Sequence, residues 1–246
     1  MPRKAPSERK VRADESELET RPANGSQSAA SKARSADDLA NLALKACLIA
    51  RDAAFNVRDL LTNSSRMAFL AIKDCEKELD LIERQIDERL PAAITRVSEI
   101  RARQLLSSLK STTDLERIGD LVMSVAMRVQ ARTVKIPASD VRNLVEMSAV
   151  LRDMLDLIHK GFSTLDLECA RTVLQMDKEI DRVCHGLFQK HLAETVAQGD
   201  TSGFEILLMA QALERAGDHT TNLAEDLYNL IEGRSLRHMP KKKASS

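Results

Sequence analysis

The sequence predicts an all-α protein made of two tandem three-helix bundles, six helices in all, related by internal duplication. Hydrophobic residues make up 43% of the chain, charged residues 30% and aromatic residues only 2%, a composition typical of helical bundles. Only six prolines and eight glycines interrupt it. DLERIGD at 114–120 recurs as ALERAGD at 212–218, and CEKELDLI at 75–82 recurs as MDKEIDRV at 176–183. Two matches at nearly one offset indicate a duplicated unit.

Apolar residues recur with a period near 3.6, which places three helices in each half. Short connections make neighbouring helices antiparallel. We expect Pro91 to end or kink the second helix, because proline lacks the backbone N–H that a helix interior needs. The expected helices cover 37–63, 66–89, 99–131, 139–164, 166–197 and 202–232.

Charge divides the chain into a folded acidic part with basic ends. The formal charge is +3 over residues 1–36, −8 over 37–233 and +5 over 234–246. We expect a disordered N-terminal arm (1–36), a first bundle (37–132), a second bundle (138–233) and a basic C-terminal tail (234–246). An acidic folded part argues against nucleic acid as a partner.

Neither the start of the chain nor its interior has the pattern of a membrane or export segment. The first twenty residues contain no apolar run of the secretory kind, and no stretch approaches about 20 uncharged apolar residues. These features favour a cytoplasmic protein, with peripheral membrane contact left open through its basic tails.

Each half carries two acidic pairs spaced four residues apart, which puts both carboxylates of a pair on one helix face. A hard cation would offset their mutual repulsion. A helical wheel points these side chains away from the bundle core, so we expect any metal site at the surface. The alternative is that the pairs are simply solvated, with Arg117 and Arg215 neutralising part of the charge. The pairs are Glu76 with Asp80, Glu116 with Asp120, Asp177 with Asp181 and Glu214 with Asp218.

Gly119 and Gly217 occupy equivalent positions inside two of the expected helices. A glycine there costs about 1 kcal/mol relative to alanine, so its repetition indicates a close approach of a neighbouring segment. His219 lies nearer the core edge than the carboxylates, and we expect it to pack rather than bind metal.

The segments LERIGD (115–120), LERAGDHTTNLAE (213–225) and MDKEID (176–181) resemble the PhoU family of phosphate-uptake regulators, and the likeness extends over about residues 37–233. The resemblance implies surface metal clusters, with iron first and Mg, Mn or Zn as alternatives. It adds Asn222 and Glu225 to the second cluster. Leu121, Ser124 and Met127 stand at the first-half positions of His219, Asn222 and Glu225, so we expect the stronger site in the C-terminal half.

The resemblance also implies a regulator rather than an enzyme. Such a protein would dampen phosphate uptake and phosphate-starvation signalling by docking, with its metal, to a phosphate ABC transporter and a membrane sensor kinase. We also expect a homodimer. Three alternatives stay open: an accessory regulator of a low-affinity phosphate permease, a metal-dependent phosphoesterase using a two-metal site, and a helical adaptor whose acidic pairs bind nothing.

Overall fold

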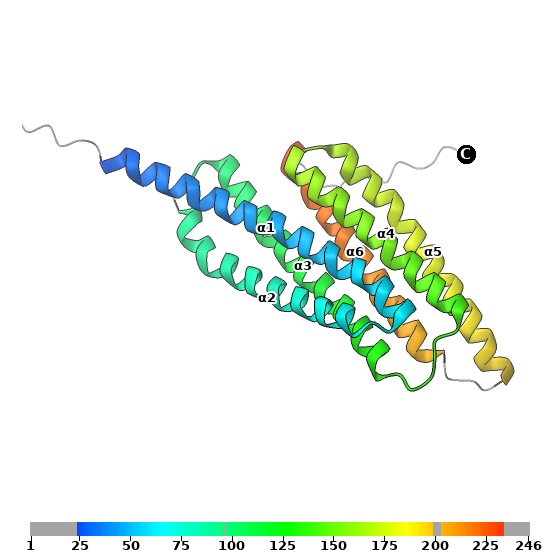
Figure 1. Ribbon diagram of the computed structural model, residues 1–246. Helices are drawn as coiled ribbons and strands as arrows, with labels where there is room; N and C mark the ends of the chain where they lie inside the picture. Colours follow the sequence, from blue (N-terminus) through cyan, green and yellow to red (C-terminus); the bar gives the residue numbers. More distant parts are fainter. Residues whose placement is uncertain (1–23, 96, 199–202, 234–246) are drawn as a thin grey trace, which may run out of the picture.

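Six α-helices form the protein, which we describe from a computed structural model of the chain (Figure 1). The structure describes the backbone of residues 24–95, 97–198 and 203–233, and within these ranges the side chains from Asp37 onward. No strand occurs in these ranges. The helices are α1 (Asn24–Asn63), α2 (Arg66–Ile94), α3 (Glu99–Ala131), α4 (Ala138–Thr164), α5 (Leu167–Gln198) and α6 (Phe204–Glu232).

The predicted duplication is confirmed in the packing of the helices. Helices α1, α2 and α3 all contact one another, and so do α4, α5 and α6. The two bundles meet through α1 against α4 and through α3 against α6, which leaves α2 and α5 on the outside (Figure 1). Four helices therefore form the middle of the molecule, and one outer helix covers each flank.

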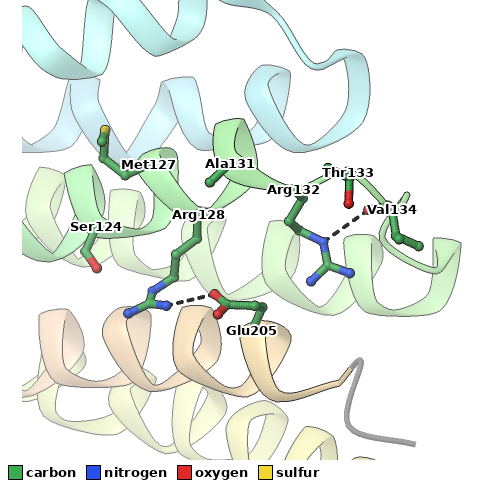
Figure 2. A pocket seen from close by; sticks show the side chains of 8 residues that line it. All are labelled: Ser124, Met127, Arg128, Ala131, Arg132, Thr133, Val134 and Glu205. Carbon is green, nitrogen blue, oxygen red and sulfur yellow. Dashed lines mark hydrogen bonds and ion pairs between the residues drawn. The ribbon is translucent and has the colours of Figure 1, made fainter.

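Helices α3 and α6 run antiparallel along their shared length. Asp114 of α3 contacts His219 of α6, while Arg128, fourteen residues further along α3, contacts Glu205, fourteen residues back along α6. The Arg128 Nη1 to Glu205 Oε2 distance is 2.8 Å (Figure 2). These polar contacts fix the register of the two bundles.

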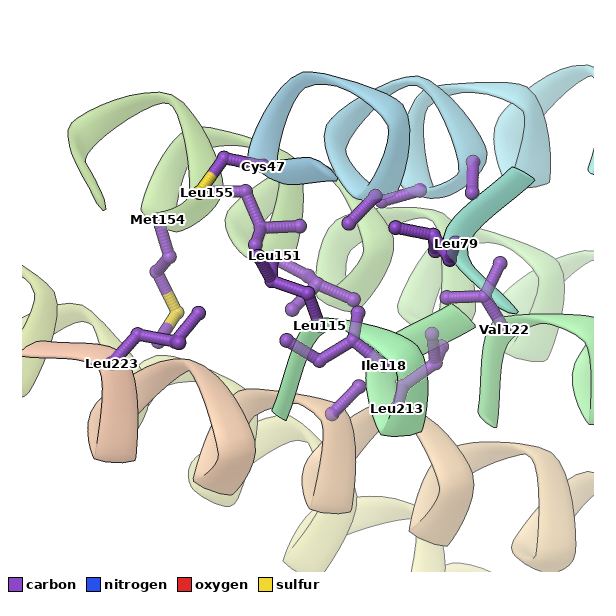
Figure 3. Close-up of a cluster of buried hydrophobic side chains, with 14 of the residues drawn as sticks. Cys47, Leu79, Leu115, Ile118, Val122, Leu151, Met154, Leu155, Leu213 and Leu223 are labelled. Atoms are coloured by element: carbon purple, nitrogen blue, oxygen red, sulfur yellow. The ribbon is translucent and has the colours of Figure 1, made fainter. Parts of the chain in front are cut away.

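A single apolar core runs through both bundles. Figure 3 shows side chains of α2 and α3 packed with side chains of α4 and α6 at the bundle interface. Leu115, Ile118 and Val122 of α3 are fully buried there, and so are Leu151 of α4 and Leu213 of α6. Because removing either bundle would expose these surfaces to water, the two halves stabilise each other.

Helix ends agree with the predicted ends to within two residues at most positions, with two exceptions. The first helix begins at Asn24 rather than at residue 37, so the prediction of disorder is wrong for residues 24–36. That segment contains four alanines, the best helix formers, beside four serines. Adding residues to an existing helix costs little because nucleation has already occurred. Residues 1–23 and the basic tail, 234–246, lie outside the described residues.

The second exception is Pro91, which lies inside α2 and does not end it at residue 89. Leu90 and Ala93, on either side of the proline, are both buried. Their packing against the core stabilises the last turn, which the missing backbone N–H alone would weaken.

Within the described ranges, no helix is both long and apolar enough to cross a membrane.

Leu115→Ala should lower the free energy of unfolding by about 2–5 kcal/mol, because it removes a fully buried side chain from the interface that both bundles share. Urea unfolding followed by circular dichroism measures this, with Leu81→Ala, at a half-exposed position on α2, as the control. Equal effects of the two substitutions would contradict the shared core.

Candidate metal centre

Four carboxylates gather between α5 and α6 in the second bundle: Asp177, Asp181, Glu214 and Asp218. Burial, followed by the charges of Asp181, Asp218 and Glu214, raises the pKa of Asp177 from its ordinary value of 3.8 to about 6. The pKa values of Glu214 and Asp218 are raised as well, first by burial and then by neighbouring carboxylates of the same group. The two predicted pairs of this half therefore form one cluster, which we call the second acidic cluster.

The first bundle holds an equivalent group between α2 and α3. Burial is the main cause that raises the pKa of Glu116 to about 7, with the charges of Asp120, Glu83 and Asp80 adding to it. Burial and the charges of Asp80 and Asp120 likewise raise the pKa of Glu76. We call this group the first acidic cluster. Its members are Glu76, Asp80, Glu83, Glu116 and Asp120.

Glu83 is the member that the sequence analysis missed. It follows Asp80 by three residues, so the signal was the continuation of one acidic helix face from Glu76 through Asp80. The equivalent residue in the second bundle is Cys184, whose thiol has its pKa raised to about 11 by burial and then by the charges of Glu214 and Asp181. The first cluster thus has a carboxylate where the second has a thiol.

The clusters lie at the surface, but the wheel overstated their exposure. Asp120, Asp181 and Asp218 are exposed, whereas Glu116 has only 16% of its side chain exposed. A helical wheel compares the direction of a side chain only with the apolar face of its own helix. It does not include the outer helix α2, which packs along the flank where Glu116 projects. A carboxylate there loses part of its hydration, which is the main cause of its raised pKa.

Arginines offset part of the charge of both clusters. Arg117 Nε lies 3.6 Å from Glu116 Oε2, and the charge of Arg215 lowers the pKa of both Glu214 and Asp218. In each case the opposing causes are larger, so the carboxylates keep a net repulsion.

Asn222 and His219, by contrast, turn toward the other bundle. His219 Nδ1 lies 2.7 Å from Asp114 Oδ1, and Asn222 Nδ2 donates to the same oxygen at 3.3 Å. His219 therefore lies at the interface between the two bundles. Asn222 contacts α3 of the first bundle there, as well as following the second acidic cluster along α6. Glu225, one turn further along α6, is half-buried.

The two glycines make room for side chains rather than for a neighbouring backbone. A Cβ at Gly217 would lie 2.9 Å from Asp177 Oδ1, and a Cβ at Gly119 would lie 2.6 Å from Leu79 Cδ1. Gly217 therefore lets the most buried carboxylate of the second cluster approach α6, while Gly119 lets a core leucine approach α3.

The donor atoms of both clusters are carboxylate oxygens, which suit hard cations such as Mg²⁺, Mn²⁺ or iron. A cation would remove the repulsion that raises the pKa values. In the part of the chain that the structure describes, no three His, Cys, Asp or Glu side chains converge closely enough to hold an ion as they stand. An open hollow of about 430 Å³ adjoins the second cluster at Asp181 and Glu214.

Stability of the metal-free protein should rise as the pH falls from 8 to about 5.5. The raised pKa values of Asp177 and Glu116 mean that the folded state binds more protons than the unfolded state in this range. Their contribution is complete below the ordinary pKa values and is lost as the pH rises through about 6 to 7. Thermal melts in EDTA test this. The double variant Asp177→Asn with Glu116→Gln should flatten the profile, and an unchanged profile would contradict the assignment.

Gly119→Ala should destabilise the fold by about 1–3 kcal/mol, because Leu79 is buried and must move within a packed core. Gly217→Ala should change stability by less than about 1 kcal/mol. There the nearest atom is the end of the Asp177 side chain, which can rotate away, and the next, Ile180 Cδ1, is 3.2 Å from the added Cβ. Alanine is also the better helix former. Urea unfolding of both variants measures the difference, and the reverse order would refute this explanation of the two glycines.

Fold and site together define a class of protein: a duplicated six-helix protein with an acidic cluster between the second and third helices of each half. The sequence matches the PhoU domain twice, over residues 43–129 and 144–227. The chain therefore belongs to the PhoU family, as its resemblance predicted.

Relatives and solved structures agree with this assignment. A phosphate-specific transport system accessory protein PhoU homolog of Rhizobium meliloti is 32% identical over 189 residues, which cover 73% of this chain and 78% of the relative. The homolog of the same name from Xylella fastidiosa strain Temecula1 is 28% identical, with 72% and 84% covered.

Two crystal structures share the fold. PhoU from Pseudomonas aeruginosa has a TM-score of 0.73 at 22% identity and covers 82% of this chain and 99% of its own. The phosphate transport system regulatory protein PhoU from Streptococcus pneumoniae has a TM-score of 0.75 at 20% identity, with 83% and 99% covered.

Proposed function

We propose that this protein is a cytoplasmic negative regulator of phosphate uptake and of phosphate-starvation signalling, and that it acts without catalysing a reaction. Membership of the PhoU family carries the proposal, because relatives over most of the chain are named as accessory proteins of a phosphate-specific transport system. The expected partners are a phosphate transporter and a membrane sensor kinase.

The two acidic clusters supply the proposed docking surface. Each gathers at least four carboxylates from two adjacent helices, and like charges held together in this way favour a cation. A bound metal ion would cancel the repulsion between the carboxylates of a cluster and hold them in one fixed arrangement. The oxygen-rich donor set suits iron, Mg or Mn better than Zn, which prefers nitrogen and sulfur ligands.

Position also favours docking over catalysis. The carboxylates lie on the outer flanks of the molecule, and the hollow beside Asp181 and Glu214 is open. A phosphoesterase would instead need a pocket that excludes water from the reacting phosphate.

Mn²⁺ at a hundred times its Kd should stabilise the wild-type protein by about 2.7 kcal/mol, which corresponds to a rise of several degrees in the melting temperature. The variant Asp177→Asn with Asp218→Asn should lose most of this gain. Asp153→Asn, which alters an exposed carboxylate on α4 paired with Arg152, is the matched control. Elemental analysis of protein purified without chelator should find less metal in the double variant than in the wild type or the control. Equal metal content in all three proteins would refute the metal sites.

Deleting the gene should raise expression of a phosphate-starvation reporter in phosphate-rich medium. The wild-type gene should restore repression, and the variant with Asp177→Asn and Asp218→Asn should not, provided that immunoblots show equal protein levels. A reporter that ignores the deletion would contradict the regulatory role. Full repression by the variant would contradict only the role of the metal.

A further inference from the structure

One end of the molecule gathers one end of each helix. Helices α1, α3 and α5 end there, and α2, α4 and α6 begin there (Figure 1). We call this end the tip and define it as residues 64–67, the linker 132–137 with the first turn of α4, the last two turns of α5 and the first turn of α6. The acidic clusters lie on the flanks, about 15–20 Å from the tip at 1.5 Å per helical residue.

Large apolar side chains with most of their surface in water concentrate at the tip. Six such side chains in the described part of the chain are more than 60% exposed, and five of them belong to the tip. The sixth, Ile100, is at the opposite end, where α3 begins. The five are Met67 (74%), Val134 (66%), Leu192 (64%), Val196 (81%) and Phe204 (64%). A gathering of this kind on one surface marks an interaction site.

Cations without an ion-pair partner also gather at the tip, although the folded part as a whole is acidic. Arg66, Arg132 and Lys135 of the tip, and Arg142 in the next turn of α4, form no ion pair with any carboxylate that the structure describes. The three carboxylates within the tip are already engaged: Glu205 with Arg128 at 2.8 Å, Asp140 with Lys190 at 2.7 Å and Glu194 with His191 at 2.9 Å. The unpaired cations therefore leave the tip with a positive potential.

Basic and apolar side chains of the linker line the same hollows. An open hollow of about 620 Å³ joins the linker to Glu205 at the start of α6, and Figure 2 shows the guanidinium of Arg132 beside Val134 at its edge. A second hollow of about 480 Å³ extends from the same linker to Ser64, at the turn before α2, and to Arg142 of α4. Arg132 and Val134 of the linker therefore line both hollows.

We infer that the tip rests on the surface of an anionic lipid bilayer. Cations without a carboxylate partner bind lipid phosphates and carboxylates, while exposed apolar side chains enter the boundary between headgroups and acyl chains. Leu192 and Val196 lie one turn apart on α5, whereas Met67, Val134 and Phe204 come from three other segments. The hollows beside the linker are wide and partly polar. A peptide would need one apolar groove, whereas a bilayer accepts separate side chains. In this orientation the acidic flanks stay open to protein partners.

Sedimentation with vesicles tests the inference on the full-length protein. The vesicles contain phosphatidylcholine with 30% phosphatidylserine or phosphatidylcholine alone, and EDTA is present so that metal bridges cannot contribute. We expect wild-type protein to bind the anionic vesicles at least fivefold more tightly than the neutral ones, with weaker binding as salt is raised. Equal binding to both vesicles, or no binding, would overturn the inference.

Two double variants separate the tip from the rest of the molecule. Lys135→Ser with Arg142→Ser removes unpaired charge, and Met67→Ser with Val134→Ser removes apolar surface; each should weaken binding at least fivefold. The matched control is Ile100→Ser with Arg103→Ser, at the opposite end, which should bind as the wild type does. Thermal melts confirm folding. An equal loss in the control would overturn the assignment to the tip, and so would capture of a poly-glutamate peptide without vesicle binding.

Discussion

The antiparallel packing of α3 against α6 is the contact on which the rest of the structure depends. It buries the leucines that join the two bundles and fixes their register through Asp114 with His219 and Arg128 with Glu205. Because these two helices occupy the middle, the outer helices α2 and α5 must pack on opposite flanks. Each acidic cluster forms where an outer helix meets α3 or α6.

Burial and repulsion between like charges act in the same direction in the acidic clusters. The carboxylates that face an outer helix lose hydration, and their neighbours carry the same charge, so the pKa values rise. A fold under selection for stability alone would place apolar or oppositely charged residues there. Keeping the repulsion in both halves is a cost that a bound cation would offset, which is why the clusters rather than the hollows support the functional proposal. The positive, apolar tip is separate from them, so one molecule can contact two kinds of surface.

Much of the fold could be predicted from the sequence because helix formation and the repeat are local properties. The 3.6-residue period gave α3 its bounds directly, and it located α4, α5 and α6 to within two residues. The two errors in helix ends arose where packing between helices, or the extension of an existing helix, outweighed local sequence preferences. Pro91 stays inside α2 because Leu90 and Ala93 pack on both sides of it, and α1 extends back to Asn24 from a helix that is already formed.

The sequence by itself determined the duplication, the helices and eight of the nine clustered carboxylates, since spacing along one helix depends only on helical geometry. Only the tertiary structure decided which faces meet. It brought Glu83 to Glu116, turned Asn222 toward Asp114 and half-buried carboxylates that a wheel placed in water. It also assembled the tip from helix ends that are distant in sequence. Contacts between helices depend on register and crossing, which no single helix encodes.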